Sequence, residues 1–178
     1  MSHVEVLTAD GARAEHDALC ELLIDCVNGG ASVGFLAPLS PATAHAFWRR
    51  VADWVAQGAR RLLVARDAAG RIAGSVQLVL DLPENQPHRA DLAKLLVHQR
   101  MRRQGVGEAL MIAAETVARD AGRTLLVLDT ATPEAARLYQ RTGWQLCGRI
   151  PNYALYPDGT LCATTVFYKA LAAPDRSA

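Results

Sequence analysis

The chain has 178 residues, of which 51% are hydrophobic and 21% are charged, a composition typical of globular rather than disordered proteins. Its length fits one domain with a core of its own. Nineteen basic and eighteen acidic residues give a formal net charge of +1, which excludes a whole-molecule field that would attract nucleic acid or an anionic membrane. Any anion that the protein binds must therefore be held by a local arrangement of groups.

The cysteines and histidines show no metal-binding or redox spacing. There is no C-x-x-C pair, and the histidines are scattered, so the sequence predicts reduced thiols and no metal site. The N-terminus lacks a basic stretch followed by an apolar run, and no apolar run reaches the ~18 residues of a membrane span. We therefore expect a cytoplasmic protein that binds no metal, no nucleic acid and no membrane.

In chain order, the first predicted element is a strand at Val4 to Thr8. Apolar residues at helical spacing from Ala14 to Val27 then predict a helix, which Gly29 ends. A second helix begins at Ser40, a typical N-cap that Pro41 follows at the first helical position. The N-terminal third of the chain thus reads as one strand and two helices.

The middle of the chain is predicted to be mainly β. Arg61 to Arg66 and Ile72 to Leu80 are β-rich runs, and the Asp and Gly of the segment 67–70 between them indicate a hairpin. Asp81 to Arg89 reads as a polar loop, and Asp91 to Val97 as the next strand.

The C-terminal part alternates helices and strands. A helix is predicted from Gly105 to Ala121, a short covered strand from Thr124 to Leu128, and another helix that Thr132 caps. Trp144 to Ile150 and Leu161 to Tyr168 read as two final strands around a turn.

The order of elements, β α α β β β α β α β β, predicts an α/β (α+β) fold around one sheet. Residues 1–172 are expected to form this single domain, and residues 173–178 a disordered tail.

The segment Arg102-Arg103-Gln104-Gly105-Val106-Gly107 is the clearest candidate for an anion site. It lies between a strand and the first turn of a helix, where unpaired amide groups and the positive end of the helix dipole converge. Two glycines allow a phosphate to come close to the backbone. A P-loop is excluded because Glu108-Ala109 follow the second glycine, and the dinucleotide fingerprint is weak because Leu110 stands where a small residue is needed.

Two motifs give this pattern a family likeness. Leu95-Leu96-Val97 followed by Arg102-x-x-Gly105-x-Gly107, and later Ala135-x-x-Leu138-Tyr139-x-x-x-Gly143-Trp144, resemble the signature segments of the GNAT superfamily of acyl-CoA N-acyltransferases. A narrower likeness, to the tabtoxin-resistance acetyltransferases, lies in four segments: 27–35, 91–95, 128–130 and 153–159.

The superfamily resemblance implies a mostly antiparallel, twisted sheet of about seven strands and about four helices, splayed between strands 4 and 5. It implies acetyl-CoA as cosubstrate, with its pantetheine arm inserted at the splay. The residues that the likeness assigns to acetyl-CoA are Leu95, Val97, Arg102, Arg103, Gln104, Gly105, Val106, Gly107, Glu108 and Thr132. Thr132 replaces the asparagine of many relatives. The Val97 N–H would polarise the thioester carbonyl.

The resemblance also implies catalytic residues. Tyr139 matches the tyrosine that protonates the departing CoA sulfur. Because an aliphatic amine has a pKa of about 10.4, a base or a chain of waters must take its proton, and Asp91 and Asp129 are the two candidates. Phe35 and Tyr153 are expected beside the acceptor, together with the two aspartates.

Three functions stay open from the sequence. The first is transfer of acetyl to a primary amine of a small molecule, for example a toxin or antibiotic, by a monomer or homodimer. The second is an acetyl-CoA sensor without turnover. The third is acetylation of a protein N-terminus or lysine, which would need an open groove in place of a pocket closed by the segment 29–35.

Overall fold

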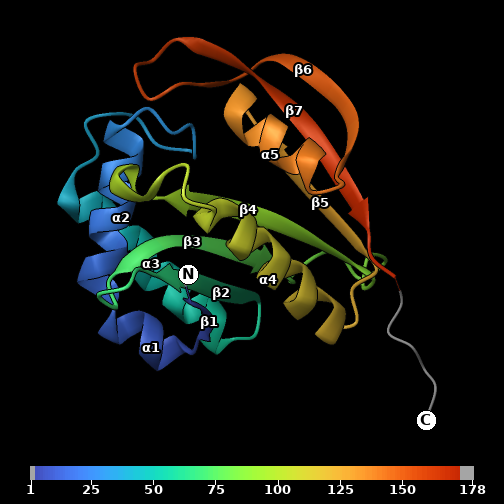
Figure 1. Ribbon diagram of the computed structural model, residues 1–178, viewed down its shortest axis with the longest axis horizontal. Helices are drawn as coiled ribbons and strands as arrows, with labels where there is room; N and C mark the ends of the chain where they lie inside the picture. Colours follow the sequence, from blue (N-terminus) through green and yellow to red (C-terminus); the bar gives the residue numbers. More distant parts are fainter. Residues whose placement is uncertain (1–2, 173–178) are drawn as a thin grey trace.

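The computed structural model describes residues 3–172, which form a 7-stranded sheet with the strand order β1-β2-β3-β4-β5-β7-β6 (Figure 1). The strands are β1 (His3–Leu7), β2 (Arg60–Arg66), β3 (Ile72–Val79), β4 (Arg89–Val97), β5 (Leu125–Thr130), β6 (Gln145–Leu155) and β7 (Leu161–Ala170). The helices are α1 (Ala9–Ala14), α2 (His16–Asn28), α3 (Pro41–Ala56), α4 (Val106–Asp120) and α5 (Pro133–Arg141), with a 3₁₀ turn η1 (Gln99–Met101). The predicted α/β (α+β) class is confirmed; the predicted tail 173–178 lies outside the described residues.

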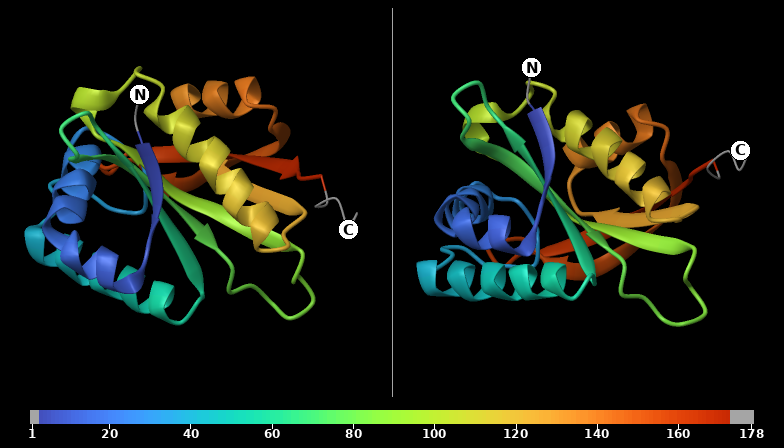
Figure 2. Two further views of the ribbon diagram at one scale, coloured as in Figure 1. Left: turned by 60° about the horizontal axis from the view of Figure 1, so that its bottom comes forward. Right: turned by 90° about the horizontal axis from the view of Figure 1, so that it is seen from below.

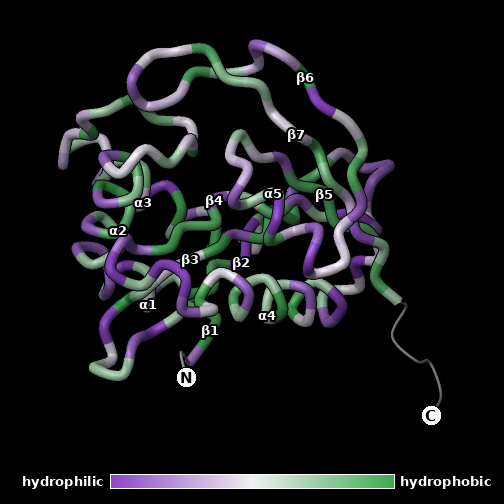
Figure 3. Tube along the Cα trace, turned by 45° about the horizontal axis from the view of Figure 1, so that its top comes forward, coloured by the Kyte–Doolittle hydropathy of each residue, from purple (hydrophilic) through white to green (hydrophobic). Residues whose placement is uncertain are grey.

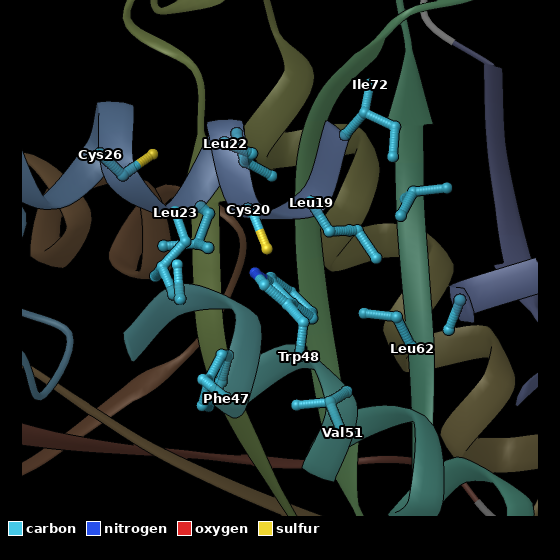
Figure 4. Packing of buried hydrophobic residues seen from close by; sticks show 14 of the residues in the cluster. Leu19, Cys20, Leu22, Leu23, Cys26, Phe47, Trp48, Val51, Leu62 and Ile72 are labelled. Atoms are coloured by element: carbon cyan, nitrogen blue, oxygen red, sulfur yellow. The ribbon is translucent and has the colours of Figure 1, made fainter. Parts of the chain in front are cut away.

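The helices cover both faces of the sheet. Helices α1, α2 and α3 pack on one face and α4 and α5 on the other (Figure 2). Each layer buries its own hydrophobic cluster, one around Trp48 of α3 (Figure 4) and one around Met111 of α4. Hydrophobic residues colour much of β3, whose first seven residues are all buried (Figure 3). A strand covered on both faces is expected to be apolar throughout.

Several element boundaries differ from the sequence prediction. The helix predicted from Ala14 to Val27 corresponds to α2, and a separate short helix, α1, precedes it, because the chain turns at Glu15, where the sequence offers no Gly or Pro signal. Strand β4 begins two residues earlier than expected, at Arg89, and β6 continues to Leu155. The extension of β6 contains a register irregularity between Ile150 and Ala154, a device that lets a strand accommodate Pro151.

Strands β4 and β5 separate, as the resemblance implies. They pair in parallel only from Arg89 to Asp91 on β4 and from Leu125 to Val127 on β5. The remaining residues of β4 keep their partner β3 on one side and have no strand on the other. Backbone groups at such an edge are free to pair with an extended ligand.

A β-bulge interrupts β4 beside this opening. The pairing of β3 with β4 shifts register between Ser75 and Gln77, and Lys94 has a φ of 54°, in the left-handed region. A bulge bends the strand and changes which side chains face each layer. Leu92 before the bulge packs in the α4 cluster, and Leu96 after it packs in the α2 and α3 cluster.

No helix among residues 3–172 has both the length and the apolar content that crossing a membrane requires.

Candidate active site

The turn before α4 has the geometry of an anion site. Arg103 and Gly105 both have left-handed φ angles, of 61° and 79°, so the backbone curls and successive amide groups can converge. Gly105 is the N-cap of α4 and no side chain caps the helix, which leaves its first-turn N–H groups to a ligand or solvent. The segment 102–105 is exposed. These observations fit the pyrophosphate of a CoA-type cofactor.

The two glycines of this turn have different physical roles. A Cβ on Gly105 would meet nothing within 4 Å, so glycine is needed there for its backbone angle. A Cβ on Gly107 would lie 3.2 Å from the end of the Leu138 side chain of α5, so glycine there avoids a tight contact between α4 and α5.

We expect Gly105→Ala to destabilise the fold by about 1–2 kcal/mol, the cost of a left-handed alanine, and also to weaken acetyl-CoA binding. Denaturant unfolding and calorimetric titration with acetyl-CoA measure the two effects. Gly70→Ala is a matched control, because Gly70 also has a left-handed φ, of 78°, with open space around it, in the β2–β3 turn. If both variants bind acetyl-CoA equally well, the turn does not hold the cofactor.

The end of β4 offers its backbone to the opening. The His98 N–H donates to the Ala73 carbonyl of β3, and antiparallel alternation therefore turns the amide and carbonyl of Val97 away from β3. Consistent with this, the Val97 carbonyl accepts from the Cys26 thiol at 3.4 Å and the Arg102 Nε at 3.5 Å. The Val97 N–H thus lies where an oxyanion donor is expected. Leu95, two residues earlier, lines the pocket beside it.

A pocket of about 320 Å³ passes through the separation of β4 and β5. Its wall on the α4 side includes Leu92, Met111 and Tyr139, and its wall on the α2 and α3 side includes Lys94 and the segment 31–34. Residues of the β6–β7 hairpin also line the pocket, and this hairpin lies at the top of Figure 1. Since one cavity joins both faces of the sheet, a cofactor arm from one face can meet an acceptor from the other.

The pocket is partly roofed by contacts between the loop after α2 and the β6–β7 hairpin. The Ala37 N–H donates to the Pro157 carbonyl at 2.8 Å, and the Ser32 hydroxyl donates to the Leu155 carbonyl at 3.4 Å. Tyr153 of the same hairpin lines the pocket and remains 57% exposed.

Tyr139 is a buried residue that lines the pocket. Its side chain is 5% exposed and packs against Trp144 and Phe167, with ring centroids 6.0 Å and 5.7 Å away. Burial, and after it the charge of Asp129, raises the pKa of the Tyr139 phenol above its usual range. The phenol is therefore protonated at neutral pH, which is the state that a proton donor needs.

The two candidate carboxylates have different surroundings. Asp129, near the end of β5, lines the pocket and accepts a hydrogen bond of 2.5 Å from Thr164. Asp91 lies at the last paired position of β4, outside the residues that line the pocket, and forms a 2.6 Å ion pair with Arg89. The pKa of Asp91 is raised overall, because burial and the charge of Asp129 outweigh the opposite effect of the Arg89 charge. The structure thus brings Asp129, and not Asp91, together with Tyr139.

Two other residues that the sequence analysis assigned to the site, Phe35 and Thr132, make contacts that stabilise the fold. Phe35 packs edge-on against Phe47, with ring centroids 5.3 Å apart, and the Lys94 ammonium lies 5.8 Å from the centroid of its ring. Phe35 is not among the residues that line the pocket. Thr132 lines the pocket and caps α5 by accepting from the Ala135 N–H at 3.4 Å.

Lys94 is a pocket residue that the sequence prediction missed. Its ammonium donates to the Val33 carbonyl at 2.6 Å, and within the described chain no carboxylate lies within salt-bridge distance of it. Burial and the charge of Arg60 lower the pKa of Lys94, while Asp129 raises it. A largely buried ammonium without a counter-ion is costly, and an anion on a ligand would offset that cost. The sequence prediction missed Lys94 because a bulge in β4 changes the face on which side chains lie, and the alternation of a regular strand does not reveal a bulge.

The sequence matches the model of the acetyltransferase (GNAT) family over residues 18–144, which is more than half of the chain. The chain belongs to this family. Membership makes the protein an acyltransferase with acetyl-CoA as its acetyl donor, and confirms the superfamily resemblance.

Solved structures agree on the fold. A phosphinothricin acetyltransferase from Sinorhizobium meliloti, in complex with acetyl-CoA, superposes with a TM-score of 0.80 at 17% identity, covering 99% of this chain and 92% of that one. For a ribosomal-protein-alanine N-acetyltransferase from Brucella melitensis the TM-score is 0.77 at 20% identity, covering 95% and 99%. For an N-acetyltransferase from Staphylococcus aureus it is 0.78 at 12% identity, covering 97% and 99%. At these identities the likeness establishes the fold of this GNAT protein.

Proposed function

We propose that this GNAT protein transfers acetyl from acetyl-CoA to the primary amine of a small molecule, as a cytoplasmic enzyme whose single domain spans residues 1–172. The observation that carries the proposal is the pocket between β4 and β5, which joins the α4 side to a half-closed chamber containing Asp129 and Lys94.

The chain's own residues have separable roles in this proposal. The turn 102–108 holds the pyrophosphate, and the free edge of β4 at Leu95 and Val97 pairs with the extended arm of the cofactor. The Val97 N–H stabilises the oxyanion that develops when an amine attacks the thioester. Asp129 accepts the amine's proton, directly or through water, and Tyr139 supplies a proton to the departing thiolate.

A small acceptor fits better than a protein N-terminus. The loop 31–34 and the β6–β7 hairpin meet over the chamber, so an extended peptide has no open groove to lie in. The structure of the phosphinothricin acetyltransferase and the likeness to the tabtoxin-resistance acetyltransferases support the same direction. The ribosomal-protein-alanine N-acetyltransferase keeps the peptide alternative open to test.

Lys94 narrows the class of acceptor within this proposal. The amine has to reach Asp129, and the nearby Lys94 ammonium retains two N–H donors beyond the one that Val33 accepts. A molecule with a carboxylate or another anionic group near its amine would satisfy both residues. We therefore expect acceptors that resemble amino acids.

The test is CoA release with wild type and Lys94→Met against amino acids, their decarboxylated amines, aminoglycosides, polyamines and short peptides. Wild type should prefer the carboxylate-bearing member of a matched pair by about 10- to 100-fold in kcat/KM, the worth of one charged hydrogen bond. Lys94→Met should lose that preference.

The decarboxylated amine is the internal control, because structural damage in Lys94→Met would lower its turnover as well. Preferential turnover of peptides would instead support the protein N-terminus reading. Bound acetyl-CoA without CoA release for any amine would support a sensor. Gel filtration of the same samples decides between monomer and homodimer.

A further inference from the structure

A cluster of metal-ligating side chains lies away from the pocket, between α2 and α3. His16 is the first residue of α2, Cys20 follows one turn later on the same face, and His45 lies in α3. Their ligand atoms all lie within 4.8 Å of one another, and they form the group of this kind found within residues 3–172. The histidines are scattered along the sequence, but the fold brings His16 and His45 together.

Two of the three ligand pairs are already in contact, at hydrogen-bonding distances close to the spacing around a small ion. His16 Nε2 lies 2.8 Å from His45 Nδ1, and Cys20 Sγ lies 3.6 Å from the same His45 nitrogen. A tetrahedral zinc ion holds its nitrogen and sulfur ligands roughly 3.3–3.6 Å apart, from its usual bond lengths. The Cys20 to His45 distance already matches. The two histidine nitrogens would separate by about half an ångström, and His16 and Cys20, whose ligand atoms lie within 4.8 Å of each other, would approach to about 3.6 Å.

An unpaired donor beside Cys20 supports a thiolate at this position. Trp48 is 1% exposed, and its indole Nε1 has no hydrogen-bond partner within the described chain. Figure 4 shows this nitrogen pointing toward the Cys20 sulfur. Buried N–H groups are rarely left unpaired, and a metal-bound thiolate is a far better acceptor than a thiol.

The surroundings leave room for a fourth ligand. An open hollow next to the cluster is lined by Asp17, Cys20, Glu21 and His45, among others, so a water or the Asp17 carboxylate could complete the shell.

We propose that His16, Cys20 and His45 bind one zinc-type divalent ion, with water or Asp17 as the fourth ligand. Binding breaks the Cys20 S–H bond, forms a sulfur–metal bond and releases the proton to solvent, without any oxidation. Two His ligands and one thiolate favour zinc over magnesium or calcium, which prefer oxygen. The ion would clamp α2 to α3, the two helices that the pocket loop connects, so the site is structural and separate from acetyl transfer.

The test titrates chelator-treated full-length protein with Co²⁺, whose spectrum reports thiolate ligation. Wild type should bind one equivalent, with a thiolate-to-cobalt band in the near ultraviolet and the visible bands of a tetrahedral site, and Zn²⁺ should displace it. Cys20→Ser should lose the thiolate band. Cys26→Ser is the matched control, since Cys26 is also a buried thiol of α2 but lies outside the cluster.

His16→Gln and His45→Gln keep the fold testable should Cys20→Ser prove unstable. Each should weaken Zn²⁺ binding by more than about 100-fold, since loss of even a hydrogen-bond partner of a ligand typically costs 10- to 100-fold. Zn²⁺ should also raise the Tm of wild type but not of these variants. An absent thiolate band in wild type, or one that survives in Cys20→Ser, overturns the proposal.

Discussion

Tyr139→Phe should lower kcat by at least about 100-fold, the lower end of what general acid catalysis contributes, while KM for acetyl-CoA changes little. Tyr139 lines the pocket, and the raised pKa of its phenol keeps it protonated across the neutral range. Without the hydroxyl, the thiolate must leave unprotonated or take its proton from water. Steady-state assays of CoA release, with acetyl-CoA and the acceptor varied separately, measure both parameters.

The fold of this variant should be intact, because no side chain of the described residues hydrogen-bonds the Tyr139 hydroxyl and the ring contacts with Trp144 and Phe167 remain. Tyr168→Phe is the matched control: Tyr168 lies on β7, hydrogen-bonds Gln145 and does not line the pocket. Since the pKa of Tyr139 is raised, its ionisation should not limit the rate at neutral pH. Equal kcat values for the two variants would remove Tyr139 from the proton-transfer step.

The backbone geometry of the candidate cofactor turn could be predicted in part because its signals are local. Gly105 marks a left-handed backbone position that is visible as a residue type in the sequence. Gly107 is expected to give a phosphate room, and the structure adds that it lies against Leu138 of α5. Thr132 with Pro133 marks a helix start in the same way. The Gly105 turn and the Thr132 cap each depend on a few consecutive residues, so pattern and structure agree there.

The acceptor half depends on tertiary geometry that a pattern does not contain. Lys94 reaches the pocket because a bulge breaks the alternation of β4, and no glycine marks that bulge. Asp91 and Asp129 look equivalent as strand-end acids, yet Arg89 pairs with the first and the pocket opens beside the second. His16 and His45 meet only because α2 packs on α3.

Asp129→Asn should lower kcat/KM by about 100-fold near neutral pH, within the range that a general base contributes, whereas Asp91→Asn should change it by less than about tenfold. Asp129 faces the chamber with one oxygen held by Thr164, while Asp91 is engaged with Arg89 outside the pocket wall. Parallel kinetics of the two variants on one acceptor make the comparison. Thr164→Val separates orientation from charge, because it removes the hydrogen bond and keeps the carboxylate.

The pH profile identifies what Asp129 does. If it removes the amine's proton, raising the pH should restore Asp129→Asn, because the free-amine fraction grows about tenfold per pH unit below the amine's pKa of about 10.4. If it only binds the ammonium, KM should rise and the loss should persist at high pH. A larger loss in Asp91→Asn than in Asp129→Asn would move the base to β4. Small losses in both would leave proton removal to water in the chamber, with Val97 and Tyr139 supplying the remaining assistance.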